Sequence, residues 1–372
     1  MKRIVFFGIK TFPSRGATDR VAENIILQLK DQYQITVYCF SDPAAADHIK
    51  GVRVKQFRRI LPGAAGSFIY FFISAVYLIL FERADLIHIH KTESSIFAPL
   101  FRLRFKVIST SHEAQYKSDK WKSYTRWFYH LAERIFVYGS NIPTCISQPL
   151  TDYYNSKYGE KVRFIPNGIN AVQESDFDFK AAEKFIPAAA DWEKPFVLFS
   201  ARRLMRIKGA HLMLMALRKI KFSGQIFITG DLHTTTEYLE ELKKLSEGLN
   251  VYFLGLVHPL PALLALIKKS QLFIFPSKTE GMSIMLLEVA SVGNPIIASD
   301  IPENTQVFGP DEVLYFKSRD TDDLADKIKF ALDNPEQLKN YGTNAKSLVY
   351  AEYLWPKVAR EYAVVYDELL KT

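Results

Sequence analysis

The sequence predicts an α/β protein built from two parallel sheets, each covered by helices on both faces. Short apolar runs alternate with helical patterns along the chain, and this alternation is typical of parallel strands that are buried on both sides. The series stops near residue 170 and starts again at residue 195. A chain of 372 residues, 48% hydrophobic and 24% charged, is long enough for two domains of ordinary composition.

Strands of the first half are expected where apolar residues run together between turn signals. They are predicted at residues 3–9, 35–40, 52–57, 86–90, 107–109 and 164–167, with helices at 19–29 and 150–158. The loop after the first strand, TFPSRGATDR, lacks the GxGxxG fingerprint of dinucleotide-binding proteins. Gly16 in this loop can still let the backbone approach a phosphate, so it is a candidate ligand contact.

Two segments of the first half have more than one interpretation. Residues 68–81, FIYFFISAVYLILF, are too short to span a bilayer comfortably. We expect a core helix there, with partial insertion into a membrane as the alternative. Residues 117–134 interleave basic with aromatic side chains at helical spacing, and this pattern suits lipid headgroups, nucleic-acid bases or a half-buried helix. The side chains concerned are Lys117, Lys120, Trp121, Lys122, Tyr124, Arg126, Trp127 and Phe128.

Residues 171–194 are acidic, alanine-rich and turn-forming, which indicates a linker between domains of residues 1–170 and 195–352. In the second domain, strands and helices again alternate. Strands are predicted at residues 196–200, 225–230, 251–254, 272–275 and 296–298, with helices at 210–217, 237–245, 284–292 and 353–369.

The stretch of residues 272–300 carries the strongest functional signal. Ser283 is a suitable N-cap for the helix at 284–292, and a glycine and a proline end that helix. Glu280 lies in the preceding loop, and Glu288 lies on the helix. Loops after parallel strands lie at the carboxyl edge of the sheet, where open α/β folds bind ligands. Two carboxylates beside the free amides of a helix N-terminus suit a ligand with both hydroxyls and phosphates.

Three further residues lie near predicted strand ends. Arg203 follows a strand and Lys208 precedes a helix, so both cations can reach a diphosphate without a metal. The alternative is that they are structural surface cations. His112 follows the strand at 107–109 and is a candidate for catalysis or substrate contact, or else a structural histidine.

No metal site is predicted. His88 and His90 share one face of a strand, but no third ligand stands at metal spacing. The D-x-D pattern of metal-dependent nucleotide-sugar enzymes occurs twice, away from strand ends, and we interpret both occurrences as solvated acidic loops. The residues are Asp176 and Asp178, and Asp320 and Asp322.

Charge and cysteine content indicate the compartment. Residues 1–170 hold 24 Lys and Arg against 13 Asp and Glu, a surplus of 11. Such a field favours an anionic partner, either nucleic acid or an acidic membrane face, or is simply a basic surface. Only Cys39 and Cys145 occur, which argues for a reducing compartment. Met1 leads directly into a strand-like run, so no signal peptide is expected and a cytoplasmic protein is predicted.

The ordered set of motifs resembles the retaining glycosyltransferases of group 1, family 4, which have the GT-B architecture of two Rossmann-like domains facing a central cleft. The E-x7-E motif reads EGMSIMLLE from Glu280 to Glu288, preceded by RLMRIKG around Arg203 and Lys208 and by IPNGI. The PSRGATDR loop resembles the P-x-R-x-G-G-x-E loop of the rhamnosyltransferases and related enzymes of bacterial surface-polysaccharide synthesis. Ala17 replaces its second glycine and Asp19 its glutamate, while Arg202 stands where the family usually has glycine.

The resemblance implies a role for each matching residue. Glu288 would bind the ribose hydroxyls, and Glu280 would hold hydroxyls of the donor sugar. Arg203 and Lys208 would neutralise the diphosphate in place of a divalent cation, and His112 would contact the donor sugar from the opposite domain. The backbone of Gly281, Met282 and Ser283 would surround the sugar and phosphates, and Gly255, Leu256 and Val257 would line the base pocket.

The expected function is therefore transfer of a sugar, with retention of configuration and without a metal or other cofactor, from a UDP-, GDP- or dTDP-linked donor to a glycan or lipid-linked acceptor. The resemblance also implies that the helix at 353–372 packs back on the first domain. An anionic membrane surface is a further expected partner, which would make the cytoplasmic protein peripheral to the cell membrane. The alternatives are a sugar-nucleotide epimerase and a non-catalytic protein that binds carbohydrate or nucleic acid.

Overall fold

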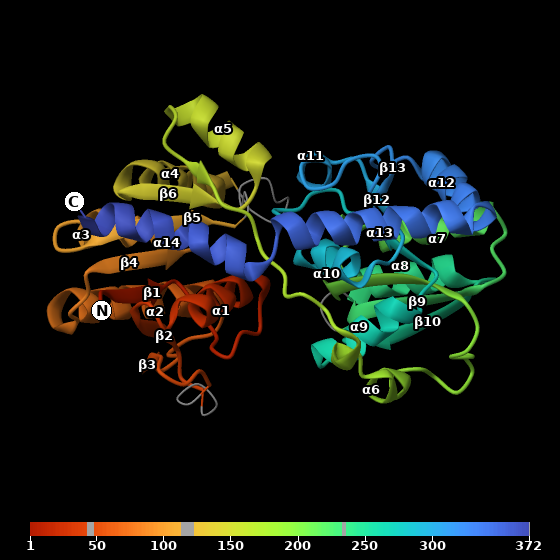
Figure 1. Ribbon diagram of the computed structural model, residues 1–372, viewed down its shortest axis with the longest axis horizontal. Coiled ribbons are helices and arrows are strands. Elements are labelled where there is room, and N and C mark those ends of the chain that lie inside the picture. The colour runs from red at the N-terminus through yellow and green to blue at the C-terminus, as the bar shows by residue number, and fades with distance from the viewer. Residues whose placement is uncertain (43–47, 113–122, 233–235, 372) are drawn as a thin grey trace. The chain divides into compact units, whose positions relative to one another are not determined.

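A computed structural model describes residues 1–42, 48–112, 123–232 and 236–371. The chain forms two compact units (Figure 1). One consists of Met1–Gly168 together with Trp355–Thr372, and the other consists of Ile169–Leu354. Each unit contains one parallel sheet covered by helices, so the predicted fold class of two parallel-sheet α/β domains is confirmed.

The sheet of the first unit has the strand order β3-β2-β1-β4-β5-β6-β7, with every pair parallel. Its strands are β1 (Arg3–Phe7), β2 (Gln34–Phe40), β3 (Arg53–Phe57), β4 (Leu86–His90), β5 (Lys106–Ser111), β6 (Ile142–Cys145) and β7 (Arg163–Phe164). Its helices are α1 (Ala17–Leu29), α2 (Gly63–Phe81), α3 (Ala98–Phe101), α4 (Ser123–Gly139), α5 (Gln148–Tyr158) and α14 (Trp355–Lys371). The strand β6 lacks a clear sequence signal because it has only four residues, one of them proline.

Alternate residues of these strands face opposite layers of helices. Ile87 and Ile89 of β4 pack with α2 and α3 in one apolar cluster. His88 lies between them, and its Nδ1 shares a hydrogen bond of 2.6 Å with the hydroxyl of Tyr366 on α14. The helix α14 also packs on α1. The C-terminal helix therefore lies in the first unit, on the face of the sheet opposite α2.

The helix α2 differs from the expectation of a short core helix. It has 19 residues, because it begins at Gly63 in the GAAGS run rather than at the first large apolar residue. Only 33% of the most apolar 18-residue stretch of this helix is buried. Within the described residues it is the one helix whose length and composition would suffice to cross a membrane. The core expectation therefore holds for one of its faces only.

The sheet of the second unit has the order β10-β9-β8-β11-β12-β13, again with every pair parallel. Its strands are β8 (Phe196–Arg203), β9 (Gln225–Asp231), β10 (Asn250–Gly255), β11 (Leu272–Phe275), β12 (Ile296–Ser299) and β13 (Leu314–Phe316). Its helices are α6 (Phe179–Glu183), α7 (Ala210–Lys219), α8 (Thr236–Ser246), α9 (Leu260–Lys269), α10 (Ile284–Val292), α11 (Pro302–Thr305), α12 (Thr321–Asp333) and α13 (Pro335–Glu352). The helices α7, α8 and α12 bury one face of this sheet in a continuous apolar cluster.

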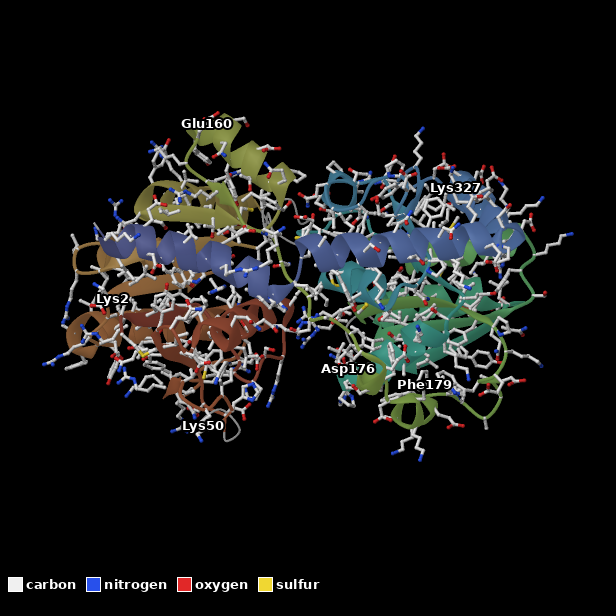
Figure 2. All side chains as sticks on the ribbon, in the orientation of Figure 1. Lys2, Lys50, Glu160, Asp176, Phe179 and Lys327 are labelled. Carbon is white, nitrogen blue, oxygen red and sulfur yellow. The ribbon has the colours of Figure 1, made fainter. Side chains whose placement is uncertain are left out.

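Residues 171–194, which the composition marks as a linker, are packed within the second unit. The amide of Asp178 donates to the Pro261 carbonyl at 3.1 Å, and the helix α6 packs on α9. Asp191 and Gln225 exchange two hydrogen bonds of 2.7 and 2.8 Å. Phe179, the first residue of α6, is exposed (Figure 2). Composition reports the polar outer surface of this segment, but not the contacts that its backbone makes.

The D-x-D aspartates act as local caps. Asp178 accepts a hydrogen bond from the Ala181 amide at the start of α6. Asp320 accepts two, from the amides of Asp322 and Asp323 at the start of α12. Backbone hydrogen bonds hold the pKa of the Asp320 carboxyl below its ordinary value. These carboxylates are engaged by backbone amides, which agrees with their interpretation as surface loops.

Candidate functional site

The order of strands in the second sheet reverses direction between β8 and β11. In open parallel sheets, this switch point opens a crevice at the carboxyl ends of the two strands, and ligands bind there. Arg203 is the last residue of β8, Lys208 lies in the loop after β8, and Glu280 lies in the loop after β11. The structure thus places the two segments singled out by their motifs on neighbouring strands at the switch point.

Side-chain and backbone contacts join these two loops directly. The Nζ of Lys208 lies 2.6 Å from Oε1 of Glu280, and only 9% of the Glu280 side chain is exposed. The backbone amide of Lys278 donates to the Ile207 carbonyl at 2.9 Å. The predicted cation and the predicted sugar-binding carboxylate are therefore direct partners, 72 residues apart in the chain.

Gly209 makes this close approach of the loops sterically feasible. Its φ of +80° lies in the left-handed region, and a Cβ atom built on it would lie 2.0 Å from the Pro276 carbonyl oxygen. Any larger residue would push the β8 loop away from the β11 loop. The glycine thus holds Lys208, the residue before it, within reach of Glu280.

The helix α10 begins and ends where the sequence indicates. The Ser283 hydroxyl caps it by accepting a hydrogen bond from the Leu286 amide at 3.2 Å, and Gly293 ends it with a φ of +83°. Its N-terminus, next to Gly281 and Met282, presents backbone amides and the positive end of the helix dipole at the edge of the sheet. This arrangement favours an anionic group of a ligand at that edge.

Glu288 is placed differently from Glu280. It lies on α10 and is 1% exposed. A ribose hydroxyl can reach this carboxylate only if neighbouring groups move. A motif spacing of eight residues identifies both carboxylates, but it does not reveal that Glu280 pairs with Lys208 while Glu288 is fully enclosed.

The remaining predicted donor contacts lie along the same sheet edge. Arg203 is the exposed last residue of β8, and its Cα is paired with that of Asp231 on β9. Gly255 ends β10, followed by the exposed Leu256 and the buried Val257. Since β9 separates β10 from β8, this predicted base pocket starts two strands away from the Lys208 loop.

His112 lies in the first unit, directly after β5, and is 8% exposed. Its Nε2 is 3.1 Å from Nδ1 of His90, and the two rings stack with their centroids 5.3 Å apart. Burial, reinforced by the Lys91 charge, lowers the pKa of His112 to about 3. The ring is therefore neutral at physiological pH and can donate or accept a hydrogen bond, but it carries no charge.

Sequence reasoning missed the polar cluster beside His112. The Asp19 carboxylate accepts hydrogen bonds from the Thr11 hydroxyl at 2.8 Å and from the Lys91 ammonium at 3.0 Å. Although burial raises the pKa of Asp19, Lys91 and these hydrogen bonds lower it more, and the carboxyl stays ionised. Lys10 lies near the same charges. The clue available in the sequence was the placement of Lys91 directly after the strand β4.

Gly16 is less distinctive than the sequence suggests. It is the N-cap of α1 with an extended φ of −137°, and a Cβ there would lie no nearer than 4.0 Å to another group. Neither backbone conformation nor crowding requires glycine at this position. The aromatic residues Trp121, Tyr124, Trp127 and Phe128 lie outside the described residues or side chains, as do Lys117, Lys120, Lys122 and Arg126.

Comparison with known proteins assigns both units. The family model "Glycosyl transferases group 1" matches residues 182–348, and "Glycosyltransferase Family 4" matches residues 18–173. An uncharacterized glycosyltransferase of Methanocaldococcus jannaschii is 26% identical over 246 residues, which cover 64% of this chain and 62% of that protein.

A lipid-carrier enzyme is also similar. The N,N'-diacetylbacillosaminyl-diphospho-undecaprenol alpha-1,3-N-acetylgalactosaminyltransferase of Campylobacter jejuni is 27% identical over 187 residues, 48% of this chain and 46% of the enzyme.

Solved structures match over the whole chain. Sucrose-phosphate synthase from Thermosynechococcus elongatus superposes with a TM-score of 0.82 at 18% identity, covering 100% of both chains. HepE from Anabaena, in complex with UDP and glucose, gives a TM-score of 0.80 at 17% identity, covering 99% of this chain and 100% of HepE. With two parallel-sheet units and family matches to each half, the chain belongs to the group 1, family 4 glycosyltransferases and has the GT-B fold.

Proposed function

We propose that the protein transfers a sugar from a nucleotide-linked donor to a glycan or lipid-linked acceptor, with retention of the anomeric configuration and without a metal ion. The observation that carries the proposal is the Lys208–Glu280 pair at the switch point of the second sheet. A cation and a carboxylate in direct contact, next to the N-terminus of α10, match a ligand that joins a sugar to a diphosphate.

Each group of the site has a role in this proposal. Glu280 accepts hydrogen bonds from hydroxyls of the donor sugar. Lys208 and Arg203, together with the amides at the start of α10, stabilise the negative charge that develops on the diphosphate as it leaves. Glu288 holds the ribose after the enclosing groups have moved. The amides and the two cations supply the positive charge for which other transferases use a divalent cation.

No protein nucleophile is assigned. The acceptor hydroxyl attacks the anomeric carbon on the face from which the diphosphate departs, and the bond to the diphosphate oxygen breaks. That oxygen takes the acceptor proton, so the configuration is retained and the charges balance. His112, which is neutral, contacts the donor sugar as a hydrogen-bonding group rather than as an acid or base.

The donor and the acceptor are proposed as classes. UDP, GDP and dTDP are candidate nucleotides, and UDP is supported by its presence in the similar HepE structure. A lipid-linked acceptor is supported by the similar Campylobacter jejuni enzyme, whose name specifies a diphospho-undecaprenol substrate. Such a substrate lies at a membrane, so the protein would work at the cytoplasmic face of the cell membrane, in polysaccharide or glycolipid synthesis.

Thermal unfolding in the presence of a panel of nucleotide-sugars tests the donor class. The correct donor should raise the unfolding temperature, because a ligand that binds the folded state stabilises it by mass action. Donors linked to UDP, GDP, dTDP and ADP should be included, with the free nucleotides as controls. Binding of none of them would favour the alternative of a non-catalytic carbohydrate- or nucleic-acid-binding protein.

Two substitutions then test the assignment of roles. Glu280→Gln and Lys208→Gln should each lower kcat/KM by about 100-fold or more, as loss of a charge-stabilising group does in other enzymes. Glu241→Gln is the matched control, because Glu241 pairs with Arg206 of the same loop and lies outside the proposed contacts. Full activity of the Glu280 and Lys208 variants would refute the site.

The product and the requirements of the reaction test the mechanism. Nuclear magnetic resonance of the product should show the anomeric configuration of the donor, and inversion would contradict same-face attack. Transfer should persist in a chelator; loss of activity that Mg²⁺ or Mn²⁺ restores would contradict a metal-free site. Conversion of the donor sugar without an acceptor would instead identify an epimerase.

A further inference from the structure

The helix α2 exposes a large apolar surface. We call this surface the α2 face, and it consists of outward-pointing residues of the helix and of the turn before it. They are Ile60, Leu61, Phe68, Phe72, Ile73, Val76, Leu80 and Phe81. Leu80 is 61% exposed and Phe81 is 68% exposed. Exposed apolar residues that occur singly need no explanation, but a contiguous row of this length indicates an interaction surface.

The exposed residues form a stripe along one side of the helix. Phe68, Phe72, Val76 and Leu80 follow one another at intervals of four residues, which places them on one side of a helix. The opposite side packs against the sheet through Tyr70, Phe71, Ala75 and Leu78. Both sides of α2 are therefore apolar, although only one is covered by the protein.

The α2 face continues onto the end of α3. Arg104 donates a hydrogen bond to the Ile79 carbonyl, which brings the chain after α3 next to the last turn of α2. Leu103, the residue before it, is 82% exposed, and Leu100 is exposed as well. The apolar surface thus includes side chains from two helices that the fold brings together.

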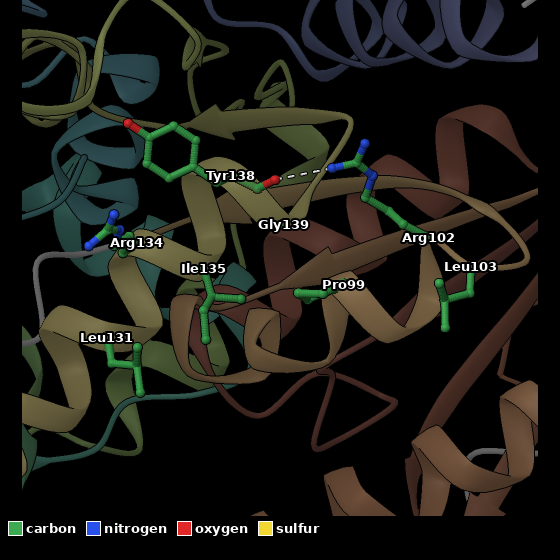
Figure 3. A pocket seen from close by; sticks show the side chains of 8 residues that line it. All are labelled: Pro99, Arg102, Leu103, Leu131, Arg134, Ile135, Tyr138 and Gly139. Carbon is green, nitrogen blue, oxygen red and sulfur yellow. Dashed lines mark hydrogen bonds between the residues drawn. The ribbon is translucent and has the colours of Figure 1, made fainter.

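A shallow pocket of about 840 Å³ borders this surface between α3 and α4 (Figure 3). Leu103, Leu131 and Ile135 form its apolar lining. Arg102 and Arg134 also line it, and the guanidinium of Arg102 donates to the Tyr138 carbonyl at 3.1 Å. Arginine and apolar side chains that line one pocket match the chemistry of a lipid, which joins a phosphate to acyl chains.

The exposed charged side chains of residues 48–112, which include the α2 face, are all basic. Three carboxylates occur in residues 48–112, and none of them is exposed: Glu82 is buried, and Asp85 and Glu93 are half-buried. Arginines stand at both ends of the helix and beside Leu103. These exposed arginines are Arg58, Arg59, Arg83, Arg102 and Arg104.

We propose that the α2 face and the end of α3 bind an anionic phospholipid bilayer, with α2 lying in the plane of the interface. The apolar stripe enters the boundary between headgroups and acyl chains, and the arginines contact the headgroup phosphates. This inference names the surface that carries the membrane association in the proposed function, and it rests on that function only for its biological purpose.

Two other uses of the same surface fit less well. A symmetric dimer would place the surface against its own copy, and so would bring the arginine clusters of two chains together at a cost in repulsion. A membrane-spanning α2 would have to leave the sheet. It would then lose the hydrogen bond of 2.7 Å from the Tyr70 hydroxyl to the Ile9 carbonyl and expose the apolar residues that α2 covers. An interfacial helix keeps all of these contacts.

Vesicle flotation with the full chain tests the proposal. Wild-type protein should float with vesicles of phosphatidylcholine mixed with phosphatidylglycerol, and much less with phosphatidylcholine alone. Phe72→Gln combined with Leu80→Gln should weaken binding by at least about tenfold, because two exposed apolar side chains no longer enter the lipid. Val364→Gln is the matched control, since Val364 is 65% exposed on α14, across the sheet from α2.

The contribution of charge is measured separately. Arg58→Gln and Arg59→Gln should each weaken binding to the anionic vesicles by roughly fivefold, the equivalent of one basic residue near an anionic surface. Arg360→Gln is the control, because Arg360 is an exposed arginine on α14. High salt should also weaken the binding of the wild-type protein, because it screens the attraction between the arginines and the anionic headgroups.

Site-specific labelling reports whether α2 itself enters the lipid. Burial raises the pKa of the Cys39 and Cys145 thiols to about 12, so at neutral pH a thiol-reactive dye should label an added exposed cysteine selectively. A polarity-sensitive dye on Val76→Cys should shift to the blue when anionic vesicles are added. The same dye on Val364→Cys should not shift.

Three outcomes would overturn the proposal: no binding to anionic vesicles, equal binding by the Phe72/Leu80 variant, or equal loss in the α14 control. Concentration-dependent dimerisation that the Phe72/Leu80 substitutions abolish would assign the surface to a second copy. All variants should keep the wild-type unfolding temperature and donor-induced shift, because only exposed residues change. If vesicle binding fails while the donor still binds, this inference fails alone; if the donor fails to bind while vesicles are bound, the proposed function fails alone.

Discussion

Replacing Gly209 by alanine should separate the two loops that form the donor site. The loop after β8 approaches the loop after β11 at this residue, where an added Cβ would lie 2.0 Å from the Pro276 carbonyl oxygen. That oxygen belongs to the backbone and has no rotamer through which it can move aside. We therefore expect the β8 loop to shift outward and Lys208 to move away from Glu280.

The loss of unfolding free energy in Gly209→Ala has two parts, and a matched control separates them. Gly248 has nearly the same φ, +82°, but an added Cβ would meet nothing within 4 Å. Gly248→Ala should lower the free energy of unfolding by about 1 kcal/mol. Left-handed strain destabilises the folded state by about 1–2 kcal/mol, and the lower entropy of the less flexible unfolded chain offsets part of this. Gly209→Ala carries the same strain plus overpacking of about 1–3 kcal/mol, which gives about 3 kcal/mol in total.

Calorimetry and donor titration measure both consequences. For a domain of this size, each kcal/mol lowers the unfolding temperature by about 2–4 °C, so we expect a decrease of about 3 °C for Gly248→Ala and about 9 °C for Gly209→Ala. Donor affinity should fall in the Gly209 variant only. Equal decreases in the two variants, or unchanged donor affinity in the Gly209 variant, would refute the inference that close contact between the loops builds the site.

Three further predictions concern stability. The pKa of His112, about 3, lies below its ordinary value of 6.5, so between these pH values the unfolded state binds a proton that the folded state does not. The stability that the neutral, buried His112 contributes is therefore complete above pH 6.5. It is lost as the pH falls toward 3, at about 1.4 kcal/mol per pH unit. The free energy of unfolding, measured with urea, should therefore change less between pH 7 and pH 5 for His112→Gln than for wild type. A control substitution at the exposed His258 should leave the wild-type change between these pH values unaltered. Tyr366→Phe should lower the unfolding free energy by about 1–3 kcal/mol, since it leaves the buried Nδ1 of His88 without its partner; an unchanged urea midpoint would contradict this. Ser283→Ala should cost about 1 kcal/mol and Ser283→Asp much less, because aspartate also caps a helix; equal losses in thermal unfolding would show that capping is not the cause.

Local signals were sufficient for most of the fold. Apolar runs predicted β4 and β11 at the observed bounds, and the Ser283 and Gly293 caps predicted α10 at its observed bounds. Caps and buried strands are specified by a few adjacent residues, so the sequence reports them directly. The order of the strands was not predicted, because it depends on contacts between segments far apart in the chain.

The two faces of α2 show where local patterns lose information. A helix that is apolar all round has little amphipathic periodicity, so its composition cannot tell a covered side from an open one. The segment of residues 171–194 shows the converse, since its polar composition conceals specific contacts with the second unit. In both cases the missing information was the identity of the neighbouring element.

The sequence by itself determined that two α/β domains are present and that Glu280, Glu288, Arg203 and Lys208 are the residues of interest, because motif spacing and strand-end placement are local properties. Only the tertiary structure decided that Lys208 contacts Glu280, that Glu288 is enclosed, and that His90 contacts His112. These facts depend on which strands become neighbours, and packing of the whole sheet sets that order.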